Sequence, residues 1–192
     1  MTTDLEAATG RSEALRTGKV IAVCYSQELI NGVGKQPHQA GEVTRLGMPG
    51  DRHYGETRVS SSRGVVPNDR PITIVGREAL VDTCERLGVP LVPPGGLGEN
   101  ILTEGLGDLS DVLPGDVVRI IPASELSDGA EPAVILLARK QNEPCGNLKI
   151  YHRMMTKELL GKRGVICTVE KEGAVRVGDR VELVRPARQT AT

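Results

Sequence analysis

The residue with the clearest capacity for chemistry is Cys145, which stands between Pro144 and Gly146. It follows an apolar run, residues 133–138, and precedes a segment whose apolar residues recur at helical spacing. We therefore expect the thiol where a helix begins, because unpaired backbone N–H groups and the positive end of the helix dipole favour an anion there. Lys149 adds positive charge nearby in sequence. Since the thiolate is the form of cysteine that attacks sulfur and binds metals, Cys145 is predicted to be the reactive residue.

The other three cysteines lie in apolar patterns. Cys24 ends a strand-like run, Cys167 alternates with valines, and Cys84 falls on the apolar side of a helical segment. Free cysteine in such settings behaves as a small buried hydrophobe, so we expect these three to belong to the core. Cys145 sits among polar residues and turn formers, which favours exposure. An ordinary loop thiol is the competing interpretation for Cys145.

Two polar segments are candidates for a binding site. Gly50-Asp51-Arg52-His53 combines an acid and a titratable ring, and the competing interpretation is a turn tied by side-chain hydrogen bonds. Gly95-Gly96-Leu97-Gly98-Glu99-Asn100 is a glycine-rich loop whose backbone amides could bind an oxyanion. Asn31-Gly32-Val33-Gly34-Lys35 lacks the spacing and the following Ser or Thr of a Walker motif, which argues against a nucleotide hydrolase. Lys35 is interpreted as a solvated loop lysine, with contact to an anion as the alternative.

Composition narrows the functional classes. The 192 residues carry a net charge of −1 and include no Phe, no Trp and three Tyr, which disfavours binding to nucleic acid. No apolar stretch is long enough to predict a membrane span, and the first residues lack the pattern of a signal peptide. The four cysteines are scattered, as in proteins with reduced thiols. These features predict a cytoplasmic location.

Short β-branched runs dominate the chain, which predicts a mainly β (α+β) fold, an antiparallel barrel or sandwich with few helices. The predicted strands are Lys19 to Tyr25, Glu42 to Leu46, Pro71 to Val75, Asp116 to Ile121, Ala133 to Arg139, Gly164 to Glu170 and Arg180 to Val184. Helical spacing covers Arg77 to Leu87 and Asn147 to Leu160, each followed by a glycine. Residues 1–17 are interpreted as a polar N-terminal tail, 18–185 as one domain and 186–192 as a C-terminal tail.

Several motifs together resemble the MOSC domain family in order and spacing. They are Gly50-Asp51-Arg52-His53, then Arg70-Pro71-Ile72-Thr73-Ile74 with Glu78 behind it, then Gly98-Glu99-Asn100, and then Pro144-Cys145. The family is named for the C-terminal domain of molybdenum cofactor sulfurase. The resemblance covers residues 18–185 and is closest to a bacterial stand-alone form, without the aminotransferase-like domain or the second β-barrel domain of larger relatives. The segments 57–68 and 124–131 look specific to this chain.

The resemblance implies a β-barrel with a few peripheral helices and a site around one cysteine. It aligns Cys145 with the family cysteine, which is proposed to carry a persulfide or to ligate molybdenum, and so implies both a catalytic and a metal-binding role. The residues that it aligns with cofactor binding are Asp51, His53, Arg70, Gly98, Glu99 and Asn100. A molybdenum–pterin cofactor is the candidate ligand, and no pyridoxal phosphate of its own is expected.

Three functions follow from this resemblance as expectations. The first is a sulfur carrier or sulfurtransferase, in which a Cys145 persulfide receives sulfur from a partner cysteine desulfurase, itself dependent on pyridoxal phosphate, and passes it to an acceptor. The second is a small molybdenum-dependent reductase of N-hydroxylated compounds. The third is a non-catalytic module that binds the cofactor or a small anion. Neither nucleic acid nor membrane is an expected partner.

Overall fold

The computed structural model describes residues 14–60, 64–125, 127 and 130–186. The secondary-structure elements of these residues, in chain order, are β1 (Ala14–Cys24), β2 (Pro37–His38), β3 (Ala40–Val43), β4 (Thr57–Ser60), β5 (Gly64–Pro67), β6 (Ile72–Gly76), α2 (Arg77–Leu87), β7 (Ile101–Glu104), β8 (Val117–Ile121), the 3-10 helix η1 (Ala123–Glu125), β9 (Val134–Gln141), the 3-10 helix η2 (Gly146–Ile150), α3 (Met155–Glu158), β10 (Val165–Lys171), β11 (Gly173–Arg176) and β12 (Arg180–Val184).

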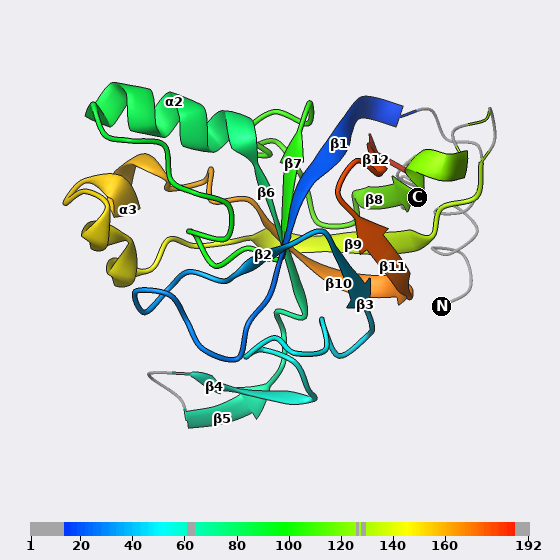
Figure 1. Ribbon diagram of the computed structural model, residues 1–192, viewed down its shortest axis with the longest axis horizontal. Coiled ribbons are helices and arrows are strands. Elements are labelled where there is room, and N and C mark those ends of the chain that lie inside the picture. The colour runs from blue at the N-terminus through cyan, green and yellow to red at the C-terminus, as the bar shows by residue number, and fades with distance from the viewer. Residues whose placement is uncertain (1–13, 61–63, 126, 128–129, 187–192) are drawn as a thin grey trace, which may run out of the picture.

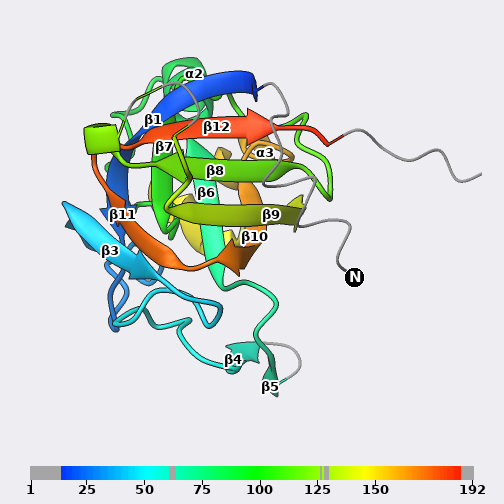
Figure 2. The same ribbon diagram turned by 90° about the vertical axis from the view of Figure 1, so that its right-hand side faces the viewer.

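Seven strands close into a barrel in the order β12-β8-β9-β10-β6-β7-β1, and β12 pairs with β1 to complete the circle (Figure 2). Every neighbouring pair in this barrel is antiparallel except β6 and β7. The short strand β2 extends the sheet beside β1, while β3 with β11 and β4 with β5 form separate two-stranded sheets. The predicted mainly β barrel with few helices is confirmed.

The core has two parts. Aliphatic side chains fill the barrel interior, as expected of a chain without Phe or Trp; they include Val20, Ile72, Ile101, Ile120 and Leu136. A second apolar cluster lies between the barrel wall and the helices α2 and α3, which lie on one side of the barrel (Figure 1); it includes Cys24, Leu80, Leu97, Leu148 and Met155. No helix within the described ranges has the length and apolar character needed to cross a bilayer.

Two similar Gly-Asp turns begin neighbouring strands of the barrel. Gly115 and Gly178 adopt φ values of 94° and 96°, which are strained for residues with a side chain. The following carboxylates accept backbone hydrogen bonds within each turn: Asp116 from Leu113 at 2.9 Å, and Asp179 from Arg176 at 2.7 Å. The strands that they begin, β8 and β12, pair with each other. The similarity in sequence thus reflects similar turn geometry.

The helix predicted over Asn147 to Leu160 is wrong as one continuous element. The structure has the 3-10 helix η2, then a turn, then the short helix α3. Side chains that helical spacing placed on one face, such as Leu148 and Met155, are still buried, so burial alone does not require a continuous helix. Within the turn, His152 Nδ1 accepts the backbone N–H of Met154 at 3.2 Å, and such side-chain bonds compete with helical ones.

Other element boundaries differ from the expectations. Strand β1 begins at Ala14, within the segment interpreted as a tail, because residues 14–19 pair with β12. The described part of the chain-specific segment 57–68 forms a hairpin of β4 and β5. This hairpin extends away from the barrel (Figure 2). Residues 61–63 fall outside the described residues, as do 126, 128 and 129 of the second such segment and 187–192 of the C-terminal tail.

Gly164 is a position where a side chain should be poorly tolerated. Its φ is +84°, and a Cβ atom there would collide with the carbonyl oxygen of Ile74 on the neighbouring strand. We expect Gly164→Ala to lower the free energy of unfolding by about 3 kcal/mol, because backbone strain and overpacking each cost about 1–3 kcal/mol. Urea unfolding measures this loss. Gly115→Ala is the matched control: its φ is +94° but a Cβ would meet nothing within 4 Å, so a loss as large as that of Gly164→Ala would contradict the collision.

Candidate functional site

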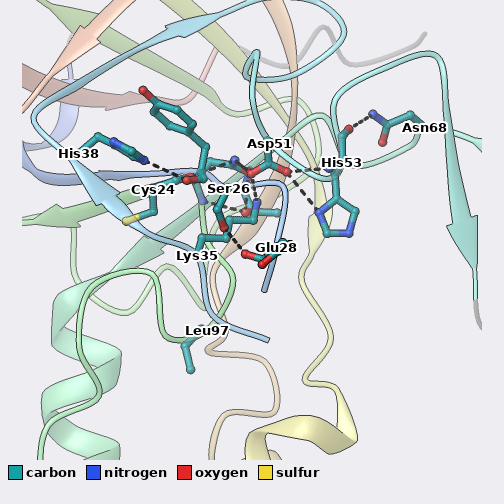
Figure 3. Close-up of polar contacts among 12 residues, drawn as sticks. Cys24, Ser26, Glu28, Lys35, His38, Asp51, His53, Asn68 and Leu97 are labelled. Carbon is teal, nitrogen blue, oxygen red and sulfur yellow. Dashed lines mark hydrogen bonds and ion pairs between the residues drawn. The ribbon is translucent and has the colours of Figure 1, made fainter. Parts of the chain in front are cut away.

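Asp51 is the centre of a buried polar network beside the barrel (Figure 3). Its Oδ2 atom lies 2.8 Å from Nζ of Lys35 and accepts a hydrogen bond from Nδ2 of Asn100 at 3.1 Å. Its Oδ1 atom accepts the backbone N–H of His53 at 2.7 Å and lies 3.4 Å from His53 Nδ1. Asp51 therefore stabilises a turn through side-chain hydrogen bonds, as one interpretation of the motif predicted, and it also orients the His53 ring.

Lys35 is not the solvated loop lysine that the sequence suggested. Only 2% of its side chain is exposed, and its ammonium group is paired with Asp51. Burial alone would raise the pKa of the Asp51 carboxyl, but hydrogen bonds from His53 and the Lys35 ammonium group outweigh burial, and the net effect lowers this pKa. Burial lowers the pKa of the Lys35 ammonium group, and the Asp51 carboxylate acts in the opposite direction. We treat the pair as ionised, because each charge stabilises the other in a place where water cannot.

Asn100 joins the network to the barrel. Its Oδ1 atom accepts the backbone N–H of Thr73 at 3.1 Å and the Thr73 hydroxyl at 3.0 Å. Its Nδ2 atom also donates to the backbone oxygen of Cys24 at 3.3 Å. Asn100 precedes β7, Thr73 lies on β6 and Cys24 ends β1, so three adjacent barrel strands fix the position of the Asp51 carboxylate.

The glycine-rich loop does not offer its amides to an external anion. The fully buried Glu99 carboxylate accepts the backbone N–H groups of Gly95 at 2.7 Å and Leu97 at 3.0 Å. Burial raises the pKa of Glu99, although these amides act in the opposite direction. The Glu99 carboxylate thus occupies the place of the oxyanion expected in this loop, and its hydrogen bonds fix the loop conformation.

Arg163 is a site residue that the sequence analysis missed. It is 7% exposed, and its guanidinium donates to the backbone oxygens of Glu143 and Leu97, each at 2.6 Å. It also lies close enough to Cys145 for the two side chains to interact electrostatically. Burial lowers the pKa of this guanidinium, whereas the charges of Cys145 and Glu99 act in the opposite direction. A single arginine in a turn before β10 gives little signal in sequence, because its partners lie far away along the chain.

A small cavity of about 60 Å³ opens beside this network. It is lined by Lys35, His53, Arg70, Thr73, Gly98, Asn100, Asn142 and Arg163. The structure therefore brings the predicted residues His53, Arg70, Gly98 and Asn100 to one cavity. Asp51 lies behind its wall, where it holds His53 in place. Lys35 and Arg163 add two buried cations; the sequence analysis gave contact of Lys35 with an anion only as an alternative and did not indicate Arg163.

Cys145 differs from the other cysteines in exposure. It is half-buried, whereas Cys24, Cys84 and Cys167 are buried. Burial also raises the pKa of the Cys167 thiol to about 12, which makes it a poor nucleophile at neutral pH. The 3-10 helix after Cys145 spans only five residues, so the guanidinium of Arg163 is the better-defined positive group beside this sulfur. Arg163 also lines the cavity and thereby connects it to the thiol.

Comparisons with known proteins agree with this architecture. The family model described as the MOSC domain matches residues 49–182. YuaD of Bacillus subtilis, named as a candidate metal-sulfur cluster biosynthesis protein, is 32% identical over an alignment that covers 71% of this chain and 76% of YuaD. The YuaD crystal structure is similar with a TM-score of 0.74 and 26% identity, covering 89% of this chain and 98% of that one. YiiM of Escherichia coli shares the fold, with a TM-score of 0.59, 21% identity, and coverage of 89% and 72%.

Proposed function

The chain belongs to the MOSC domain family, and from that premise we propose that Cys145 is a sulfur carrier, loaded by a cysteine desulfurase and unloaded to an acceptor in metal–sulfur metabolism. The observation that supports this most is the pairing of a half-exposed thiol with a buried arginine that also borders a cationic cavity. The name of YuaD points to the same area of metabolism. Under this proposal the desulfurase is a separate protein with its own pyridoxal phosphate.

Loading requires a sulfur atom to move between two thiolates. The Cys145 thiolate attacks the outer sulfur of the donor's persulfide, and a new S–S bond forms as the donor's S–S bond breaks. The donor thiolate leaves with the electron pair, so no external oxidant is needed. Arg163 serves this step by holding positive charge at the sulfur, first on the attacking thiolate and then on the persulfide anion.

The cavity does not fit a whole molybdenum–pterin cofactor. Its volume of about 60 Å³ is well below the roughly 300–1,000 Å³ of sites that enclose organic ligands. We therefore derive no step through that cofactor, and the sulfur-carrier role stands on Cys145 and its cationic surroundings.

Incubation with a cysteine desulfurase and cysteine is expected to add the mass of one sulfur atom to the protein, and a thiol reductant should remove it. Intact-mass spectrometry measures both changes. Cys145→Ser should gain nothing, whereas Cys84→Ser, which alters a buried thiol on α2, should load like the unmodified chain. An equal gain in Cys145→Ser, or no gain in the unmodified chain, would contradict the proposal.

A further inference from the structure

The charge of the cavity favours a small anion. Eight residues of the described structure line the cavity. Three of them carry a positive charge (Lys35, Arg70 and Arg163), one is His53, and none has a carboxylate. Asp51 neutralises Lys35 from behind the wall, whereas among the described residues the guanidinium of Arg70 has only a long ion pair, with Asp69. Asp69 lies 3.9 Å from Arg70, too far for a hydrogen bond. The cavity is therefore a cationic site that favours binding of an anion.

Two donors in this cavity lack partners. The Nε atoms of Arg70 and Arg163 are buried, and within the described part of the chain neither has a hydrogen-bond partner. Arg163 is itself more than nine-tenths buried, so the missing bond is not made to bulk solvent. A buried donor without a partner is destabilising, and a bound acceptor would remove that penalty. Guanidinium groups bind oxyanions with paired N–H groups, so an oxyanion is the chemical class that suits both arginines.

The size of the cavity narrows the ligand further. One water molecule needs about 10–15 Å³ of such volume, so about 60 Å³ accommodates roughly four to six atoms of that size. A sulfur oxyanion with five non-hydrogen atoms fits this range, and a peptide or a nucleotide does not. The ligand is thus small. Arg163 lines the cavity and also interacts electrostatically with Cys145, which is not itself among the lining residues.

From these observations we infer that the cavity binds thiosulfate or a similar inorganic sulfane-sulfur oxyanion, which loads Cys145 directly. This inference rests on the proposed sulfur-carrier function and names a second donor for it. The sulfonate oxygens would contact Arg70 and Arg163, with the outer sulfur towards Cys145. The thiolate attacks that sulfur, the S–S bond of thiosulfate breaks, and sulfite leaves with the bonding electron pair. Cys145 is left as a persulfide anion, so atoms and electrons balance without a further reactant.

Anaerobic incubation of the full chain with thiosulfate tests this inference. We expect about one sulfite per protein, measured colorimetrically, together with the mass gain of one sulfur atom at Cys145. Arg70→Met should raise the half-saturating thiosulfate concentration about tenfold or more, as expected for loss of a charge-assisted hydrogen bond. Arg77→Met is the matched control, because Arg77 pairs with Glu104 on α2 and β7 and does not line the cavity, and it should behave like the unmodified chain.

The outcomes separate this inference from the function on which it rests. Sulfur gain from the desulfurase without sulfite release from thiosulfate would overturn the thiosulfate donor and leave the carrier role intact. No gain from either donor would overturn both. Sulfite release that is equally fast in Arg70→Met and Arg77→Met would overturn the assignment of the cavity as the oxyanion site. Folding of Arg70→Met is checked by its urea midpoint, which should change little because the side chain is partly exposed.

Discussion

Replacing Asp51 by asparagine is expected to lower the free energy of unfolding by about 3–5 kcal/mol, the range found when one partner of a buried ion pair is removed. The asparagine side chain keeps the shape of the aspartate but leaves the Lys35 ammonium group buried without a counter-charge. The amide also has fewer acceptor positions than the carboxylate, which accepts bonds from Asn100 and His53. Urea unfolding at pH 7 measures the loss.

Asp69→Asn is the matched control for this prediction. Asp69 also pairs with two cations, Arg58 and Lys140, each at 2.7 Å, but its side chain is 41% exposed. Exposed pairs contribute about 0–1 kcal/mol, so this variant should lose far less. Similar losses in the two variants would mean that burial of the Lys35–Asp51 pair does not matter for stability, contrary to our account.

The same comparison has a defined pH dependence. Because folding lowers the pKa of Asp51, its ionisation stabilises the folded state fully above the ordinary aspartate pKa of about 3.9. That stabilisation is lost as the pH falls through the lower pKa of the folded state. The difference in stability between the unmodified chain and Asp51→Asn should therefore be constant near neutrality and shrink in acid. A difference that grew as the pH fell would contradict the direction of the shift.

Replacing Arg163 by methionine is expected to slow the reaction of Cys145 with iodoacetamide about tenfold or more. The guanidinium interacts electrostatically with this sulfur, and a charge-assisted interaction of this kind contributes about 1.5–3 kcal/mol. Peptide mass spectrometry at neutral pH gives the alkylation rate of each cysteine. The buried Cys167 reports unfolding in the same sample, so a fast reaction there identifies molecules that have lost the fold.

Lys149→Met separates this contact from general positive charge. Lys149 follows Cys145 closely in sequence but is exposed to solvent. Screening by water and salt should make its loss almost without effect on the alkylation rate. If the two variants slowed the reaction equally, proximity to Arg163 would not be what sets the reactivity of Cys145.

Features set by local sequence were predicted well. The helix α2 runs from Arg77 to Leu87 as its spacing indicated, and Gly88 ends it with φ of 62°. Six of the seven barrel strands were predicted because β-branched runs alternate with glycine turns, but the four-residue strand β7 (Ile101–Glu104) was missed. The segment after Cys145 shows the limit of this reasoning: the apolar spacing identified which residues are buried, but it could not tell one long helix from two short ones.

The site depends on contacts that are distant in sequence, and these were predicted only in part. The family resemblance identified Asp51 and Asn100, which a hydrogen bond joins in the structure, and it identified Cys145 as the reactive thiol. It gave no indication that Lys35 would be buried, because its partner lies on another loop. Nor could it assign Arg163, whose acceptors are backbone oxygens that sequence does not distinguish.

The most direct test of the central claim is to locate the transferred sulfur. After treatment with a desulfurase and cysteine, an alkylating reagent traps any persulfide, and peptide mass spectrometry identifies the residue that carries it. Our account predicts a trapped persulfide at Cys145 and no added sulfur at Cys24, Cys84 and Cys167. A persulfide at one of those three buried cysteines, with Cys145 unmodified, would contradict it.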